Sequence, residues 1–305
     1  MPLVTSKEML QVAVEGHYAV GAFNANNMEQ IQGIVNAAVA EEAPVILQVS
    51  QGAIRYAGLE FAAAMVKTAA EMADVPVVLH LDHGTDFSQN VRCLRAGFTS
   101  LMFDGSALPF EENVAITARV AEIAHIVGIP VEAELGKVLK STDNVSEQDV
   151  LDAMTKPEQA REFVERTKCD SLAVAVGSVH AMRSQAAELN LDRIRAIREQ
   201  VDIPFVLHGS SGVREESALE AIPYGIAKIN VATLLNQAFT TGIKRGLAEL
   251  PDNVDPRKIL VHSRDEVMEA VRHKIQIFGA SGQATSSGYR SPRRVFPKAE
   301  LGEAE

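Results

Sequence analysis

The stretch that decides the fold runs from Pro44 to Gly84 and reads PVILQVSQGAIRYAGLEFAAAMVKTAAEMADVPVVLHLDHG. It begins with an apolar, β-branched run, continues through a longer segment with helical spacing, and ends in a second apolar run. A proline precedes each apolar run, and because proline cannot continue a helix, it marks a boundary between helix and strand. Both runs are largely apolar on successive positions, which is typical of parallel strands covered by helices. The stretch therefore predicts one strand–helix–strand unit.

The same alternation recurs along most of the chain. The predicted strands are Ala19–Phe23, Val45–Val49, Val77–Leu81, Ser100–Phe103, Val131–Ala133, Ser171–Val176, Phe205–Leu207 and Ala227–Val231. The helical segments include Met28–Glu42, Leu59–Met72, Phe110–Val127, Glu158–Thr167, Leu191–Gln200 and Glu215–Ile222. Eight strands at a spacing of roughly 30 residues, the size of one βα unit, predict an α/β fold of the (β/α)8 or TIM-barrel type. An open doubly wound sheet is the alternative, which the absence of a G-x-G-x-x-G turn after the first strand disfavours.

One domain is expected over residues 1–284, because α/β barrels of this length are often single domains. A further helix is predicted over Arg264–Phe278, after the eighth unit. The connection Leu135–Pro157 is the longest between a predicted strand and helix, and a loop of such length is usually functional. Residues 285–305 are polar and charged, and we expect a C-terminal extension that is mobile or packed on a partner subunit.

Composition excludes several classes of function. The chain has 29 basic and 40 acidic residues, a net charge of −11, which does not favour nucleic acid or a membrane surface as a partner. Its 47% hydrophobic content excludes disorder as the dominant state. Two cysteines cannot form a disulfide framework or a four-cysteine zinc site. No run is apolar enough to span a bilayer and no signal-peptide pattern opens the chain, so a cytoplasmic location is expected.

Polar residues stand where each apolar strand ends. They are Asn24, Ser50, Asp82 with His83, Asp104, Glu134, His180, His208 and Asn230. In a (β/α)8 barrel the carboxyl ends of the strands converge on one mouth, where active sites lie. A capping or turn role would explain any one of these residues, but a polar residue at every strand predicts a functional site.

Three of the eight histidines occupy these mouth positions: His83, His180 and His208. Three imidazoles with one open position are typical of a catalytic Zn²⁺ ion. Glu134 and Asp104 are candidates for orienting the histidines or for serving as alternative metal ligands. A glycine lies near each histidine, so the backbone can turn closely there.

Two turns rich in glycine and serine, Val176–His180 and His208–Gly212, follow the sixth and seventh strands. The segment Asn230–Thr233, NVAT, opens a helix after the eighth strand. In this fold the loops after strands seven and eight often bind phosphate through backbone N–H groups. A phosphate site is therefore expected beside the metal, with simple tight turns as the alternative.

At these residues the chain resembles the class II, zinc-dependent fructose/tagatose-1,6-bisphosphate aldolase family. The matching stretches are GAFNANNME (Gly21–Glu29), LHLDHG (Leu79–Gly84), AGFTSLMFDGS (Ala96–Ser106), VEAELG (Val131–Gly136), AVAVGSVH (Ala173–His180), HGSSGV (His208–Val213), GIAKINVAT (Gly225–Thr233) and DPRK (Asp255–Lys258). They follow the family's order up to about Ala284. NVAT is more similar to the tagatose-bisphosphate branch, since the fructose-bisphosphate branch usually carries Asp where Ala232 stands.

The resemblance implies a reaction, the reversible cleavage of a ketose 1,6-bisphosphate to dihydroxyacetone phosphate and an aldehyde phosphate. Zn²⁺ on the three mouth histidines would act as a Lewis acid that stabilises the enediolate formed when the C3–C4 bond breaks. Asp82 would take the proton of the C4 hydroxyl group and return it in the condensation direction. Glu134 and Asp104 would lie beside the metal.

The resemblance also implies substrate contacts. The dihydroxyacetone phosphate end would contact Gly209, Ser211, Asn230 and Thr233, and the aldehyde half would contact Asn24 and Ser50. A monovalent cation, Na⁺ or K⁺, would lie near Gly177 and Ser211. Arg257 would reach the site of a neighbouring subunit, where a bidentate guanidinium suits a phosphate, and the chain would be a homodimer or homotetramer.

The chain departs from the family pattern at the phosphate and in the loop after the fifth strand. Ala181 replaces a glycine, so its N–H survives but a methyl group crowds the phosphate, and Arg183 replaces an aromatic residue. Thr142 stands where the family carries the glutamate that protonates the enediolate, and Asp143 follows it. Either Asp143 substitutes, or Asp82 performs both proton transfers, or the substrate differs.

Three alternatives stay open. The same residues fit an aldolase for another ketose phosphate or for a phosphorylated keto acid. A Schiff-base aldolase would need a desolvated lysine at a strand end, and the candidates are Lys228 and Lys137. A phosphosugar-binding protein without turnover would also explain the departures.

Overall fold

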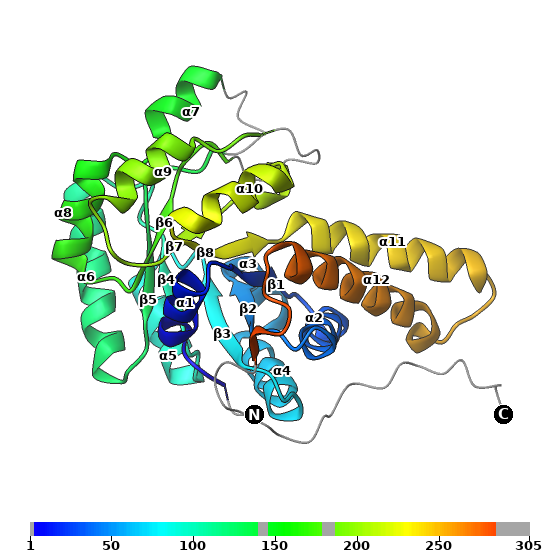
Figure 1. The fold of residues 1–305 in the computed structure, drawn as a ribbon. Helices are drawn as coiled ribbons and strands as arrows, with labels where there is room; N and C mark the ends of the chain where they lie inside the picture. Colours follow the sequence, from blue (N-terminus) through cyan, green and yellow to red (C-terminus); the bar gives the residue numbers. More distant parts are fainter. Residues whose placement is uncertain (1–2, 140–145, 179–186, 285–305) are drawn as a thin grey trace.

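Eight parallel strands form one sheet that curls into a barrel with helices on its outside (Figure 1). The computed structural model describes residues 3–139, 146–178 and 187–284. The strands are β1 (Val20–Asn24), β2 (Val45–Ser50), β3 (Val77–Asp82), β4 (Leu101–Phe103), β5 (Val131–Leu135), β6 (Ser171–Val174), β7 (Phe205–Leu207) and β8 (Ile226–Val231). Every predicted strand is present with its ends within two residues of the expected ones. The predicted (β/α)8 barrel is confirmed.

The helices follow the strands in turn. They are α1 (Ser6–Glu15), α2 (Met28–Ala40), α3 (Gln51–Ala57), α4 (Leu59–Met72), α5 (Phe87–Ala96), α6 (Phe110–Ile126), α7 (Glu147–Ala153), α8 (Pro157–Thr167), α9 (Leu191–Arg198), α10 (Glu215–Ala221), α11 (Thr233–Glu249) and α12 (Pro256–Ile277), with 3₁₀ turns η1 (Ser210–Gly212) and η2 (Ile222–Tyr224). The six βα-unit helices expected from apolar spacing are all present.

The sheet order is β3-β2-β1-β8-β7-β6-β5-β4, which leaves β3 and β4 to close the barrel. Isolated parallel bridges join them, His80 to Ser100 and Gly84 to Phe103. The N–H of Leu81 donates to the carbonyl of Ser100 at 3.1 Å. The pairing at this junction is interrupted, whereas the register of β2 with β3 is continuous over six residue pairs.

The strands are buried on both faces because the barrel interior lies on one side and the helices on the other. All residues of β3, β7 and β8 are buried, as the near-continuous apolar runs predict. Leu47 is fully buried in β2, and its replacement by alanine would destabilise the fold by about 2–5 kcal/mol. A few polar side chains are also buried inside, among them Gln48, His80, Glu132 and Lys228.

Two sequence expectations were wrong in detail. The helix predicted over Arg264–Phe278 begins earlier, at Pro256, because Asp255 caps it by accepting a hydrogen bond from the Arg257 N–H at 3.0 Å. The predicted loop Leu135–Pro157 contains helix α7, which a reciprocal capping box between Ser146 and Asp149 initiates.

Helices α11 and α12 form a long hairpin that extends away from the barrel (Figure 1). Two glycines of α11 allow this close packing. A Cβ added at Gly242 would lie 2.3 Å from the Cα atom of Ser263, and one at Gly246 would lie 2.9 Å from the Ile259 carbonyl oxygen. The backbones of the two helices therefore touch where a larger residue would separate them.

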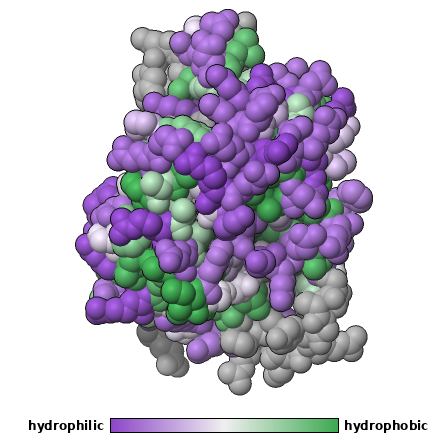
Figure 2. All heavy atoms as spheres, turned by 90° about the vertical axis from the view of Figure 1, so that its left-hand side faces the viewer, coloured by the Kyte–Doolittle hydropathy of each residue, from purple (hydrophilic) through white to green (hydrophobic). Residues whose placement is uncertain are grey.

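On the side of α6 and α8 the outer surface is mostly hydrophilic with smaller hydrophobic patches, as expected for the solvent faces of amphipathic helices (Figure 2). Across the three described ranges, no helix combines the length and apolar character needed to cross a membrane.

Candidate active site

A pocket of about 250 Å³ opens at the carboxyl ends of the strands. It is lined by Asn24, Ser50, Asp82, His83, Gly209, Ser210, Ser211, Asn230, Ala232 and Thr233. Eight of these ten were candidate site residues from the sequence. Ser210 and Ala232 were not, although both lie within the glycine- and serine-rich turn and the NVAT segment. The strand-end polar residues that meet in this pocket, as the fold predicts, are Asn24, Ser50, Asp82, His83 and Asn230.

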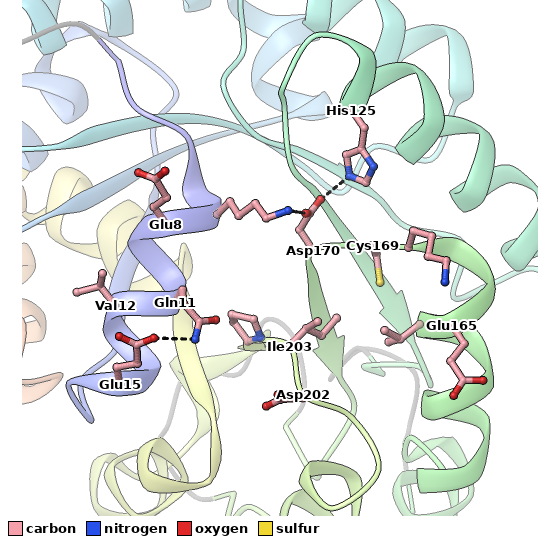
Figure 3. A pocket seen from close by; sticks show the side chains of 14 residues that line it. Glu8, Gln11, Val12, Glu15, His125, Glu165, Cys169, Asp170, Asp202 and Ile203 are labelled. Carbon is pink, nitrogen blue, oxygen red and sulfur yellow. Dashed lines mark hydrogen bonds and ion pairs between the residues drawn. The ribbon is translucent and has the colours of Figure 1, made fainter.

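A larger pocket of about 850 Å³ lies at the opposite end of the barrel, between α1 and α8 (Figure 3). Its best-placed carboxylate is already paired, because Asp170 accepts hydrogen bonds from Lys7 at 2.9 Å and from His125 at 2.7 Å. In barrels of this type the amino-terminal face contributes to stability and the carboxyl-terminal face carries function. We therefore assign the active site to the smaller pocket.

Two histidines approach each other beside this smaller pocket. His83 Nε2 lies 3.1 Å from His208 Nδ1, and the rings meet edge to face with centroids 4.7 Å apart. The other nitrogen of each ring contacts a carboxylate: His83 Nδ1 lies 2.7 Å from Asp104, and His208 Nε2 lies 2.9 Å from Glu132. A carboxylate accepts, so each ring holds its proton on that outer nitrogen.

The two inner nitrogens therefore face one another across a gap that either one proton, carried by His83, or one cation can occupy. At 3.1 Å the two nitrogens form a hydrogen bond when one of them is protonated, and a metal cation bound by both can take the place of that proton. Two nitrogens bound to one tetrahedral Zn²⁺, each at about 2.0–2.1 Å, lie about 3.4 Å apart. The amide nitrogen of Asn230 also lies 3.1 Å from His208 Nε2, but the charged carboxylate of Glu132 is the closer partner and decides where the proton resides. The donor set fits a metal ion.

Two carboxylate oxygens complete this donor set. Glu134 Oε2 lies 3.7 Å from His208 Nδ1, and Asp82 Oδ1 lies 3.9 Å from His83 Nε2. Both oxygens are buried and accept no hydrogen bond from the part of the chain that the structure describes. Leaving a buried charged oxygen without a partner is costly, so both oxygens are suited to binding a cation. Potential ligand atoms of Asp82, His83 and His208 lie within 4.8 Å of one another.

The carboxylates set the electrostatics of the pocket. Burial would lower the pKa of His83, but the negative charges of Asp82, Asp104 and Glu134 outweigh burial and raise this pKa to about 10. Burial, together with the charge of Asp104, raises the pKa of Glu134. Burial also opposes ionisation of Asp82, yet the positive charges nearby, that of His83 foremost, lower its pKa. The site strongly favours added positive charge, and Asp82 is kept ionised.

The backbone places His83 and its neighbours. His83 adopts φ of 49°, a left-handed conformation that is uncommon outside glycine and is often retained at functional sites. Gly84 follows because a Cβ there would lie 2.5 Å from the carbonyl oxygen of Met102. The N–H of Asp104 donates to the carbonyl of Gly84 at 2.9 Å, so the ends of β3 and β4 bring His83 and Asp104 together.

The turn after β7 and the start of α11, the segments expected to bind phosphate, also lie at the mouth. Gly209 has φ of 68° and leads into η1, where the hydroxyl of Ser210 donates to the carbonyl of Asn230. Helix α11 begins at Thr233 without a side-chain cap, so its first N–H groups remain for an anion. Gly177 has φ of 111° and does not line the described pocket.

Several predicted residues are placed elsewhere or lie outside the described ranges. Arg257 is exposed at the start of α12 and pairs with Asp255 at 2.7 Å, far along the hairpin from its own barrel mouth (Figure 1). The residues Thr142, Asp143, His180, Ala181 and Arg183 lie outside the described part of the chain. Sequence reasoning missed Glu132, although VEAEL in β5 places Glu132 and Glu134 on one face of the strand.

A (β/α)8 barrel whose mouth joins two imidazoles, several carboxylates and a helix N-terminus defines a metal-dependent barrel enzyme. The family model described as "Fructose-bisphosphate aldolase class-II" matches residues 4–283, and the chain belongs to this family. Members of this family are metal-dependent carbon–carbon lyases. The resemblance seen in the sequence is thereby confirmed, and the chain is an aldolase that acts on sugar phosphates.

Similar proteins agree in name. The "Probable fructose-bisphosphate aldolase" of Bacillus subtilis is 45% identical over 287 residues, 93% of this chain and 100% of that protein. The "Fructose-bisphosphate aldolase" of Geobacillus stearothermophilus is 46% identical, with 93% and 99% coverage. Among solved structures, the YdjI aldolase from Escherichia coli superposes with a TM-score of 0.81 at 36% identity, covering 92% of this chain and 99% of its own.

Proposed function

We propose that the chain reversibly cleaves fructose- or tagatose-1,6-bisphosphate to dihydroxyacetone phosphate and an aldehyde phosphate, with one Zn²⁺ ion per chain. The observation that carries the metal is the 3.1 Å approach of two imidazole nitrogens, whose outer nitrogens are both held by carboxylates, beside two buried carboxylate oxygens that accept no hydrogen bond from the described residues. His83 and His208 would hold the ion together with His180, and Glu134 is an alternative ligand. When bound, Zn²⁺ supplies Lewis-acid stabilisation for negative charge that develops on the substrate oxygens.

Asp82 is the proposed base. Its Oδ2 accepts a hydrogen bond from Asn24 Nδ2 at 2.7 Å, while Oδ1 accepts none from the described residues. In cleavage, Oδ1 takes the proton of the C4 hydroxyl group, the C4–O bond becomes a carbonyl, and the C3–C4 bond breaks. Carbon C3 then keeps the electron pair as an enediolate and must take up a proton. Asp143 is the proposed donor for that second transfer, with Asp82 as the alternative.

Backbone groups would hold the phosphate of the dihydroxyacetone half. Gly209, Ser211 and Thr233 line the pocket next to the uncapped start of α11. Asn230 lines it as well, and its Oδ1 is buried without a hydrogen bond from the described residues. We also propose Gly177 and Ser211 for a monovalent cation, and the N–H of Ala181 for the phosphate.

The aldehyde half would face Asn24 and Ser50. Ser50 has a second task, because its oxygen accepts a hydrogen bond from the Ala53 N–H at 3.2 Å and so caps α3. Asn24 is held by Gln48, whose Nε2 donates to Asn24 Oδ1 at 3.0 Å. Asn24 is therefore better placed to hold Asp82 than to choose between substrates.

We further propose that Arg257 acts in the site of a second copy within a homodimer or homotetramer, since its hairpin extends away from its own barrel (Figure 1). Residues 1–284 would form the catalytic domain, with 285–305 as an extension, and the enzyme would act in the cytoplasm. The Schiff-base alternative is disfavoured. Lys228 is buried inside the barrel and paired with Glu132 at 2.8 Å, and Lys137 is exposed.

The decisive experiment assays fructose- and tagatose-bisphosphate side by side, before and after chelation and after zinc is restored. We expect cleavage that a chelator abolishes and zinc restores. Activity that survives chelation and is trapped by borohydride would favour the lysine mechanism. Binding of dihydroxyacetone phosphate without exchange of its C3 proton, with zinc present, would indicate a binding protein. If neither substrate is cleaved, aldehydes are screened against dihydroxyacetone phosphate.

A further inference from the structure

A string of hydrogen bonds runs from His208 into the interior of the barrel. Glu132 Oε1 lies 2.9 Å from His208 Nε2, and Glu132 Oε2 accepts from Lys228 Nζ at 2.8 Å. Lys228 Nζ lies in turn 3.4 Å from His80 Nε2. His208 directly follows β7, and Glu132, Lys228 and His80 lie in β5, β8 and β3; at most 2% of any of these residues is exposed.

These hydrogen bonds continue toward the amino-terminal end of the barrel, where α1 begins. His80 Nδ1 lies 2.8 Å from the hydroxyl of Ser100, and this hydroxyl lies 2.8 Å from that of Ser6 at the start of α1. Both serines are buried. The buried ion pair of Glu132 and Lys228 thus contacts His208 on one side and His80, followed by the two serines, on the other.

A contribution to folding stability is a weak explanation for this buried ion pair. A buried ion pair loses its hydration, and apolar residues of similar volume often serve equally well or better. Lys228 does not line the described pocket, so it does not meet substrate there. An apolar residue at position 228 could not hold Oε2 of Glu132 in place. With that oxygen fixed, the first oxygen stays on His208 Nε2 and directs His208 Nδ1 at His83.

We propose that Lys228 and Glu132 form a positioning pair for the metal site, holding the ring orientation and tautomer of His208 that makes Nδ1 a ligand. This inference rests on the proposed function only in that His208 binds zinc. Outer partners of metal-bound histidines typically change metal affinity about 10–100-fold when they are removed. Lys228 acts through Glu132 and is not itself a catalytic residue.

Three variants separate positioning from packing. Lys228→Met removes the ammonium group, the closest partner of Glu132 Oε2. Lys228→Met with Glu132→Gln removes both charges but keeps an amide oxygen for the His208 N–H. Lys228→Met with Glu132→Leu removes both charges and the acceptor. The matched control is Lys274→Met, which breaks a largely buried lysine–glutamate pair, 2.6 Å from Glu215, between α12 and α10.

The main readout is the dissociation constant of zinc, measured by chelator competition on the full chain, with the visible spectrum of the cobalt-loaded protein as a second readout. We expect Lys228→Met to bind zinc about 10–100-fold more weakly than the unmodified chain and to change the cobalt spectrum. The Gln double variant should recover to within a few-fold of the unmodified chain, and the Leu double variant should not. Lys274→Met should leave zinc affinity unchanged.

Equal zinc affinities for the two double variants would overturn the proposal, and this comparison holds even if Lys228→Met does not fold, since neither double variant leaves a buried charge unpaired. A Lys228→Met protein that melts at a lower temperature in its metal-free form but binds zinc normally would also overturn it. Failure of the proposed function looks different. In that case the unmodified chain itself binds no zinc, or His208→Ala binds it as well as the unmodified chain.

Discussion

Asn24 on β1 donates a hydrogen bond to Asp82 at the end of β3, and the two atoms, Nδ2 and Oδ2, lie 2.7 Å apart. The bond spans β2, whose Gln48 holds the other end of the Asn24 amide. One oxygen of the proposed base is therefore fixed by the barrel wall, and the other is left to face His83 and the substrate.

Replacing Asp82 by alanine should leave zinc bound and reduce turnover by roughly 10²–10⁴-fold, the usual contribution of a general acid–base group. The metal should stay because the histidine lone pairs do not depend on this carboxylate. Zinc content and the rate of ketose-bisphosphate cleavage are measured on the same sample. A near-normal rate would show that another group accepts the C4 proton.

Replacing Asn24 by alanine should lower kcat with a smaller effect on KM, because Asn24 positions Asp82 and does not hold the phosphate. A hydrogen bond to a charged group contributes about 1.5–3 kcal/mol, which corresponds to roughly 10- to 100-fold in rate. Steady-state kinetics on both substrates check this. A pure KM effect would instead make Asn24 a substrate contact. The control is Asn26→Ala, because Asn26 lies on the same connection between β1 and α2 but does not line the pocket.

His83→Ala, His208→Ala and His180→Ala should each abolish zinc retention through gel filtration, since each removes one of three proposed ligands. His125→Ala is the control, because His125 pairs with Asp170 at the other end of the barrel. One zinc ion per chain persisting in all three variants would exclude this ligand set.

Gly242→Ala should lower the free energy of unfolding by about 1–3 kcal/mol, because its Cβ would meet the backbone of α12 and force the helices apart. Denaturant unfolding measures the change, and zinc affinity should not change. Gly52→Ala in α3 is the contrast. A Cβ there meets only the Ser50 hydroxyl oxygen at 3.5 Å, and alanine favours a helix by about 0.8–1.0 kcal/mol over glycine. A neutral Gly242→Ala would mean that the hairpin adjusts freely.

The strands were predictable because proline and β-branched residues mark them locally. The missed helices carried weaker signals. Helix α5 is polar on average, and its start depends on the cap that Asp86 provides to the Ser88 N–H. Helix α11 was expected after NVAT, but its extent was not predicted, because it contains glycines that lower helix propensity and suit its packing against α12. Only the structure shows that these glycines allow α11 to pack closely against α12.

The mouth residues were predictable from a polar residue at each strand end, since the fold itself brings these ends together. Glu132 was not assigned a role in the site, and Lys228 was considered only as a Schiff-base lysine, because their contacts depend on which strands face one another across the barrel interior. That relation is three-dimensional and leaves no local pattern. The alternation of Glu132 and Glu134 was the one available signal, because strand residues two apart share a face.

The barrel has a seam where β3 meets β4, and this seam lies next to the proposed metal site. His83 leaves one edge, Asp104 leaves the other, and their 2.7 Å contact crosses it. An ion held by His83 would link the two strands across this interrupted pairing. Stripping it should therefore speed amide hydrogen exchange along this seam first, at Leu81 and Asp104, while the continuous pairing of β2 with β3 keeps its protection.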